Sequence, residues 1–271
     1  MTDATLHRLE TYYDAVPRGR ADAEDIGPFT LFVARSGWPY YARPRVGEQR
    51  TASPADVRRV LDRQRELDVP LAFEWVAEVT PDLERVAQAA GMHVERCPLL
   101  VLDGAPRGEA GSARMLGPDE VQYLALSRAA IEVGFQTGGT ATGTEGLAAR
   151  DAAAGKGFAQ IDDAVRERLA AGEIRAAACW ASEAVALGPV GGGGHTPVGE
   201  VTEIAGVAVL PAFRRRGLAA AVTYVLARDA LDSGGATVFC SAQSVEVARI
   251  YQRVGFRTTA TACIAAMPAA G

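Results

Sequence analysis

One segment in the last third of the chain constrains the fold most: an apolar strand that leads through an arginine-rich turn straight into a helix. The strand pattern runs from Val201 to Val209 and is followed by Pro211. Three consecutive arginines come next, and helical spacing of apolar residues then continues from Gly217 to Asp232. A buried strand joined this closely to a helix is typical of folds in which helices cover a sheet.

The same junction has the chemistry of an anion site. The first turn of a helix carries N–H groups without intrahelical partners and a partial positive charge. Gly217 leaves space for a bound group, and the small side chains of Ala219 and Ala220 do not project far from the first turn of the helix. Positive field comes from Arg214, Arg215 and Arg216. The sequence therefore predicts a phosphate site with a diphosphate as the expected ligand. An ordinary solvated basic turn is the alternative.

Composition limits the class of protein. The chain has 271 residues, a formal net charge of −5 and 48% hydrophobic residues, so it is long enough for one large or two small domains and too apolar for a disordered chain. We expect no membrane partner, because no apolar run approaches the ~20 residues of a membrane span. Residues 1–10 lack a signal-peptide core, so we expect a cytoplasmic protein. The acidic balance argues against a nucleic-acid partner.

The cysteines and histidines indicate no metal site. The four cysteines are widely spaced and contain no CxxC pair, which is typical of buried thiols in a reducing compartment. His93 and Cys97 lie four positions apart in a predicted strand, where that spacing is too long for one metal ion. We therefore expect no metal cofactor.

A glycine-rich seam at residues 103–111 divides the chain into two expected domains, 1–105 and 111–271. In the first domain, strands are expected at 29–35, 38–45, 71–78 and 92–102, and a turn at Ser36-Gly37 joins the first two. Helices are expected to begin after Ser53 and Thr80. In the second, strands are expected at 113–116, 174–181, 183–189, 201–209, 237–241 and 257–265, with helices from Pro118, within 146–172, and at 217–232 and 244–254. The four glycines 191–194 are expected to form a turn, with His195 as a surface loop residue. The predicted fold class is α/β (α+β), a mixed sheet covered by helices.

The two parts share a pattern at a constant offset of 164 residues. Residues 75–92 line up with residues 239–256, and each stretch reads as a strand, a short helix that ends in glycine plus a large apolar residue, and a further strand. Shared ancestry and chance convergence both remain open.

Arg214-x-x-Gly217-x-Ala219 matches a known signature. It resembles the Gln/Arg-x-x-Gly-x-Gly/Ala loop of the GNAT superfamily of acyl-CoA-dependent N-acetyltransferases. A second family element, an Asn or similar residue followed seven positions later by Tyr and then by Gly-Phe, is similar to Ser244, Tyr251 and 255–256 here. The resemblance covers roughly residues 111–271.

The resemblance implies a GNAT-like mixed central sheet and a related, degenerate N-terminal unit at 1–105 that helps to shape the acceptor side. That unit has Ala87 at the position that matches Tyr251 and has no Arg-x-x-Gly-x-Ala loop. It is therefore not expected to bind CoA.

The resemblance also implies where acetyl-CoA, the co-substrate, binds. The backbone of one strand end would pair with the pantetheine arm where that strand splays from the strand at 237–241, and the loop amides would bind the pyrophosphate. The implied cofactor-binding residues are Val207, Ala208, Val209, Arg214, Arg215, Arg216, Gly217, Leu218, Ala219, Ala220, Ser244 and Tyr251. Ser244 stands where Asn is more common, and its hydroxyl has less reach than an amide.

Two residues are candidates for proton transfer. The resemblance implies that Tyr251 protonates the departing thiolate; a core aromatic is the alternative. An amine acceptor arrives mostly protonated and needs a base. Glu203 stands eleven residues before Arg214, where some family members carry that base. The alternative for Glu203 is a solvent-facing carboxylate at the end of a strand. Glu200 is a weaker candidate for the base.

The sequence thus predicts direct transfer of an acetyl group from acetyl-CoA to a primary amine, carried by a small molecule or a peptide. The main alternative is a catalytically silent module that binds or senses acetyl-CoA. A further one is an interaction protein that offers its arginine turn to an acidic partner. The identity of the acceptor and the oligomeric state, including a homodimer, stay open.

Overall fold

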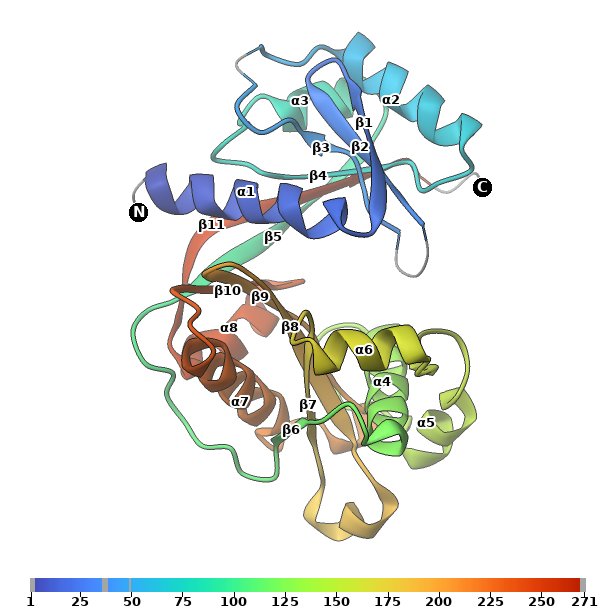
Figure 1. The fold of residues 1–271 in the computed structure, drawn as a ribbon, viewed down its shortest axis with the longest axis vertical. Helices are drawn as coiled ribbons and strands as arrows, with labels where there is room; N and C mark the ends of the chain where they lie inside the picture. Colours follow the sequence, from blue (N-terminus) through green and yellow to red (C-terminus); the bar gives the residue numbers. More distant parts are fainter. Residues whose placement is uncertain (1–2, 36–38, 49, 269–271) are drawn as a thin grey trace. The chain divides into compact units, whose positions relative to one another are not determined.

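The computed structural model describes residues 3–35, 39–48 and 50–268 (Figure 1). The chain divides into two compact units. The first unit comprises Met1–Leu99 with Thr259–Gly271, and the second comprises Leu100–Thr258. Strands β5 (His93–Leu102) and β11 (Phe256–Ala266) contribute residues to both units. The assignment of residues 1–105 and 111–271 to separate domains stays a prediction.

The first unit combines a small three-stranded sheet, three helices and the outer strands of a larger sheet. Its elements are α1 (Asp3–Arg18), β1 (Ala21–Ile26), β2 (Phe29–Ala34), β3 (Arg43–Pro44), α2 (Pro54–Glu66), β4 (Ala72–Val76) and α3 (Leu83–Ala89). The order β1-β2-β3 is antiparallel, and the larger sheet begins β4-β11-β5. The strands expected at 71–78 and 92–102 are confirmed. The turn at Ser36-Gly37 and the start of the strand at Trp38 lie outside the described residues.

Helix α2 begins where its sequence predicts. Ser53 is the N-cap: its Oγ accepts from the N–H of Asp56, and a carboxylate oxygen of Asp56 accepts from the Ser53 N–H at 2.9 Å. Pro54 occupies the first helical position, where its missing N–H costs nothing. The Arg50 guanidinium, which pairs with the Asp56 carboxyl, holds the pKa of that carboxyl well below its usual range.

The second unit carries most of the large sheet. Its elements are β6 (Arg114–Leu116), α4 (Val121–Gln136), α5 (Leu147–Ala153), η1 (Gly157–Ala159), α6 (Asp163–Ala170), β7 (Arg175–Cys179), η2 (Ser182–Leu187), β8 (Gly191–Val198), β9 (Val201–Val209), η3 (Pro211–Phe213), α7 (Leu218–Asp232), β10 (Thr237–Ser241) and α8 (Val245–Val254). Its strand order is β5-β10-β9-β8-β7-β6, in which β9 and β10 are parallel and β6 to β9 are antiparallel. The predicted fold class, a mixed sheet flanked by helices, is confirmed.

Helices cover both faces of this sheet (Figure 1). A Cβ on Gly192 would meet Ser127 of α4, whereas one on the next residue, Gly193, would meet Leu226 of α7. Successive residues of a strand point to opposite faces. Helix α4 therefore lies on one face and α7 on the other.

The glycine run is a strand, so the turn expected at Gly191 to Gly194 is wrong. A Cβ at Gly192 would lie 2.0 Å from the Oγ of Ser127 and 2.6 Å from the carbonyl oxygen of Ala177. Glycine is required here because α4 and β7 approach the β8 backbone closely. The strand expected at 183–189 is also wrong, since Ser182–Leu187 forms the 3₁₀ helix η2.

His195 is a buried strand residue, not the surface loop residue expected. It lies in β8 and is only 2% exposed. Its Nε2 lies 2.9 Å from Oδ2 of Asp229 in α7, and its Nδ1 lies 2.9 Å from Oγ1 of Thr202 in β9. These contacts join two strands to a helix and leave the imidazole no path to a ligand.

The paired strand–helix–strand pattern is present in the structure. The first copy is β4, α3 and β5, and the second is β10, α8 and β11. Both helices are followed by a glycine in the left-handed region, Gly91 with φ 93° and Gly255 with φ 107°.

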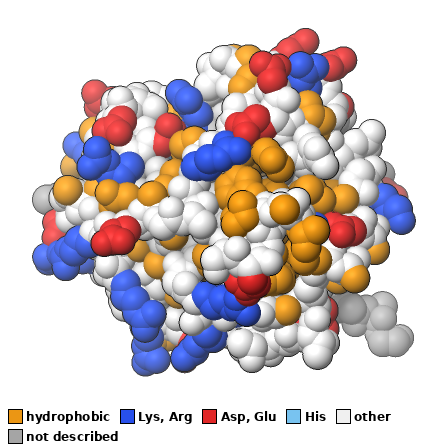
Figure 2. Space-filling model, turned by 90° about the horizontal axis from the view of Figure 1, so that it is seen from below, with side chains coloured by type: hydrophobic (Ala, Val, Ile, Leu, Met, Phe, Trp, Pro, Cys, Tyr) orange, Lys and Arg blue, Asp and Glu red, His pale blue; other side chains and the backbone are white. Residues whose placement is uncertain are grey.

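Basic and acidic side chains are interspersed on the face seen in Figure 2. No helix of the described residues has the length and apolar character to cross a bilayer.

Candidate functional site

The backbone bends sharply between β9 and α7. Arg215 and Gly217 both lie in the left-handed region, with φ of 66° and 79°, and Gly217 is the N-cap of α7. The first intrahelical bond runs from the Ala221 N–H to the Gly217 carbonyl at 3.0 Å. The N–H groups of Leu218 to Ala220 therefore have no acceptor one turn earlier. A Cβ on Gly217 would meet nothing within 4 Å, so the space beside Gly217 at the start of the helix is open.

The three arginines of the turn have different environments. Arg214 faces inward and donates to three backbone carbonyls. Burial lowers the pKa of its guanidinium, which stays charged because arginine titrates far above neutral pH. Arg216 pairs with Glu183 of η2 and lies over the Phe213 ring at 5.2 Å. Arg215 is exposed, and within the described part of the chain its side chain has no ion pair.

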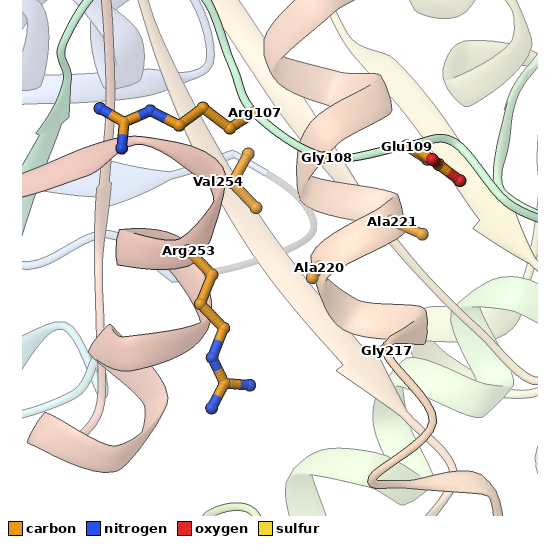
Figure 3. Close-up of a pocket in the computed structure, with 8 residues that line it drawn as sticks. All are labelled: Arg107, Gly108, Glu109, Gly217, Ala220, Ala221, Arg253 and Val254. Atoms are coloured by element: carbon orange, nitrogen blue, oxygen red, sulfur yellow. The ribbon is translucent and has the colours of Figure 1, made fainter.

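A cavity of about 200 Å³ opens beside the first turns of α7 (Figure 3). Its lining residues are Arg107, Gly108, Glu109, Gly217, Ala220, Ala221, Arg253 and Val254. Sequence reasoning did not single out Arg107 or Arg253. Arg253 lies two residues after Tyr251, but only the packing of α8 beside α7 shows that it reaches this cavity.

Strands β9 and β10 are paired over a short register only. It runs from the Thr237–Val201 pair to the Phe239–Glu203 pair. Val207 to Val209 lie beyond its end, while on the other side Ala208 and Val209 pair with β8. A bulge at Gly206, with φ 68°, adds one residue to β9 between these two stretches. Backbone donors and acceptors of β9 are therefore placed where an extended ligand can pair with them.

Glu203 lies near Tyr251, where its carboxylate disfavours ionisation of the phenol. Tyr251 belongs to α8, is 5% exposed and makes an edge-to-face contact with Phe256. Burial, with Cys240 and Glu203 nearby, raises the pKa of its phenol well above the ordinary value of 10. The phenol is thus protonated at neutral pH. Among the described residues its hydroxyl has no hydrogen-bond partner.

Ser244 caps a helix. It is the N-cap of α8, and its Oγ accepts from the N–H of Val247 at 3.4 Å. The structure therefore accounts for a serine at this position without a ligand. A contact between Ser244 and the cofactor stays a prediction.

The described residues contain no group of three or more His, Cys, Asp or Glu side chains that could hold a metal ion. The four cysteines, Cys97, Cys179, Cys240 and Cys263, are free and buried.

Known proteins share this architecture. The chain is similar to a GCN5-related N-acetyltransferase from Kribbella flavida, with 24% identity, coverage of 98% of this chain and 96% of the other, and a TM-score of 0.66. It is also similar to a GCN5-related N-acetyltransferase from Sphaerobacter thermophilus, with 16% identity, coverage of 89% and 81%, and a TM-score of 0.57. A GNAT-family acetyltransferase from Colwellia psychrerythraea has 12% identity, coverage of 99% and 98%, and a TM-score of 0.53. These likenesses show the fold.

No curated protein matches the chain. The model of the acetyltransferase (GNAT) family matches residues 158–256. This stretch contains the arginine turn, the first turn of α7, Glu203 and Tyr251. Residues 158–256 therefore form a domain of the acetyltransferase (GNAT) family, as the two sequence motifs predicted.

Proposed function

We propose that the protein transfers an acetyl group from acetyl-CoA to a primary amine by direct attack of the amine on the thioester. GNAT family and fold support acyl-CoA-dependent N-acetyltransferase activity in general. The acceptor would be an amine on a small molecule or a peptide. The observation that carries the proposal is the start of α7, where N–H groups lack intrahelical acceptors and the space beside Gly217 is open.

The residues present fit acetyl-CoA. The N–H groups from Arg215 to Ala220 would bind the pyrophosphate, since a helix start favours negative charge and Gly217 leaves room for it. The backbone of Val207 to Val209 would pair with the amides of the pantetheine arm. When bound, acetyl-CoA supplies an activated acyl group.

Two side chains would move the protons. Glu203 would take a proton from the ammonium, directly or through water, so that the amine nitrogen can attack the carbonyl carbon. A C–N bond forms and the C–S bond breaks. Tyr251, a protonated phenol whose hydroxyl has no hydrogen-bond partner among the described residues, would donate its proton to the leaving sulfur and regain one from the attacking nitrogen, which loses its second proton as the amide forms. Backbone N–H groups of β9 would stabilise negative charge on the carbonyl oxygen, and positioning of both reactants would supply much of the acceleration.

We also propose that residues 1–105 form a degenerate GNAT-like unit that binds no CoA. Its β4–α3–β5 pattern supports this, because α3 carries Ala87 in place of a tyrosine.

The test is CoA release with a panel of amines, together with mass spectrometry of the acetylated product. Wild-type protein is expected to release CoA only with an accepted amine. Gly217→Glu is expected to bind no acetyl-CoA, because it puts bulk and negative charge at the phosphate position. Gly217→Gln is the matched neutral control and should bind weakly. Tight binding with no turnover on any amine would indicate a silent module, and unchanged affinity in Gly217→Glu would remove the site.

A further inference from the structure

Arg253 is a charged side chain at the cavity with no partner in the described protein. It is exposed on α8, and it has no ion pair or hydrogen bond from its guanidinium within the described ranges. Three nearby arginines are engaged within the protein: Arg214 with carbonyls, Arg216 with Glu183, and Arg257 with Asp103 at 2.6 Å. Arg253 is therefore available to an external anion.

The orientation of the lining side chains separates Arg253 from the other charged groups. Figure 3 shows Arg253 extending from α8 into the space beside the start of α7. The guanidinium of Arg107 and the carboxylate of Glu109 point away from Gly217, to opposite sides of the cavity. Arg253 is thus the charged group that faces the helix start across the cavity.

The size of the cavity limits what fits there. Its volume of about 200 Å³ is below the ~300 Å³ at which drug-sized ligand sites begin. The wall formed by Gly217, Ala220 and Ala221 carries no side chain longer than a methyl group. A phosphorylated sugar can enter this space, while a larger ligand would extend out of its open side.

We infer that Arg253 binds the 3′-phosphate on the ribose of CoA and so selects CoA over its 3′-dephospho form. This inference rests on the proposed function. CoA carries two separate anionic groups, the linked diphosphate and the ribose 3′-monophosphate. The amides at the start of α7 would take the first, which leaves the second for a guanidinium across the same cavity. A planar guanidinium can donate two parallel hydrogen bonds to a terminal phosphate.

The selectivity should be measurable and sensitive to salt. A charge-assisted hydrogen bond at an exposed site corresponds to roughly tenfold in affinity. Ions screen an exposed pair, so the preference should shrink when the ionic strength rises from about 0.05 M to 0.5 M.

The experiment measures the Kd of acetyl-CoA and of acetyl-3′-dephospho-CoA by calorimetry on the full chain. Three proteins are compared: wild type, Arg253→Gln and Arg228→Gln. Arg228 is the matched control because it is an exposed arginine of α7 that pairs with Asp232 at 3.8 Å, near the other end of the helix. Wild type and Arg228→Gln are expected to prefer acetyl-CoA about tenfold. Arg253→Gln should lose the preference while it binds the dephospho form as wild type does.

Two outcomes overturn the inference in distinguishable ways. If Arg253→Gln retains the wild-type preference, or if wild type binds both forms equally, Arg253 does not bind the 3′-phosphate and the proposed function stands. If wild type binds neither form, the proposed function and the inference both fail.

Discussion

The Nε of Arg214 donates to the carbonyl oxygen of Val209 at 3.1 Å, and so ties the arginine turn back to the strand from which it leaves. The other two nitrogens of the same guanidinium donate to Ala141 at 2.8 Å and to Gly134 at 2.5 Å. One side chain thus holds together the end of β9, helix α4 and the loop that follows α4. The first arginine of the signature acts on the shape of the turn.

Arg214→Lys should damage the turn although it keeps the charge. A lysine ammonium cannot reach three divergent carbonyl oxygens as a planar guanidinium does. We expect a loss of about 1–2 kcal/mol in the free energy of unfolding, together with weaker binding of acetyl-CoA. Urea denaturation and calorimetry measure the two effects. Arg228→Lys is the control, and equal stability of Arg214→Lys and wild type would show that the three bonds do not matter.

Tyr251→Phe should lower turnover far more than affinity. The phenol is placed to give up a proton and has no hydrogen bond to the described protein, so its removal costs little folding stability. We expect kcat to fall roughly a hundredfold, with the Kd of acetyl-CoA and the unfolding midpoint nearly unchanged. Tyr224→Phe, in α7, serves as the control. Full activity in Tyr251→Phe would take this residue out of the mechanism.

Gly192→Ala should destabilise the protein strongly. Its Cβ would lie 2.0 Å from the Oγ of Ser127 and 2.6 Å from a backbone oxygen, so α4 or β7 would have to move. Overpacking of this kind costs about 3 kcal/mol. Gly138→Ala is the control, because a Cβ there would meet nothing within 4 Å. Similar urea midpoints for the two variants would mean that α4 does not pack this closely on β8.

Stability should fall as the pH drops below about 6.5, in part because of His195. Burial lowers the pKa of this imidazole from its ordinary value of 6.5, although Asp229 opposes the shift; Thr202 is bonded to the other nitrogen, and Arg175 lies nearby. Below that value the unfolded chain binds a proton that the folded protein does not, so unfolding is favoured as the pH falls.

Denaturation between pH 7.5 and 5.5 measures this effect. His195→Gln is expected to show a shallower loss of stability over this range than wild type. Proton NMR is a second readout, since burial should keep the imidazole of His195 neutral below its ordinary pKa of 6.5. Parallel pH profiles for wild type and His195→Gln would contradict the account.

The sequence was sufficient where the signals are local. Helix α2 carries its cap within four residues, and the β9–α7 junction is one continuous stretch with a proline, a glycine and a helical pattern. The ends of α8 follow from Ser244 and Gly255 for the same reason. Such elements can be predicted because the residues that define them are neighbours in the chain.

The misses have a common physical cause. Four successive glycines resemble a turn, but Ser127 and Ala177, which require glycine in β8, lie far away in sequence. His195 was misplaced with that strand. Arg253 could not be assigned to a cavity because its position depends on two helices packing side by side. Helix α1 was not predicted, because its sequence is mostly polar.

A crystal structure of the protein with acetyl-CoA bound tests the proposed diphosphate site at the start of α7. We predict that the diphosphate lies against the N–H groups of Arg215 to Ala220, with the pantetheine arm along Val207 to Val209. A diphosphate bound elsewhere, or a helix start that stays free at saturating acetyl-CoA, would contradict it.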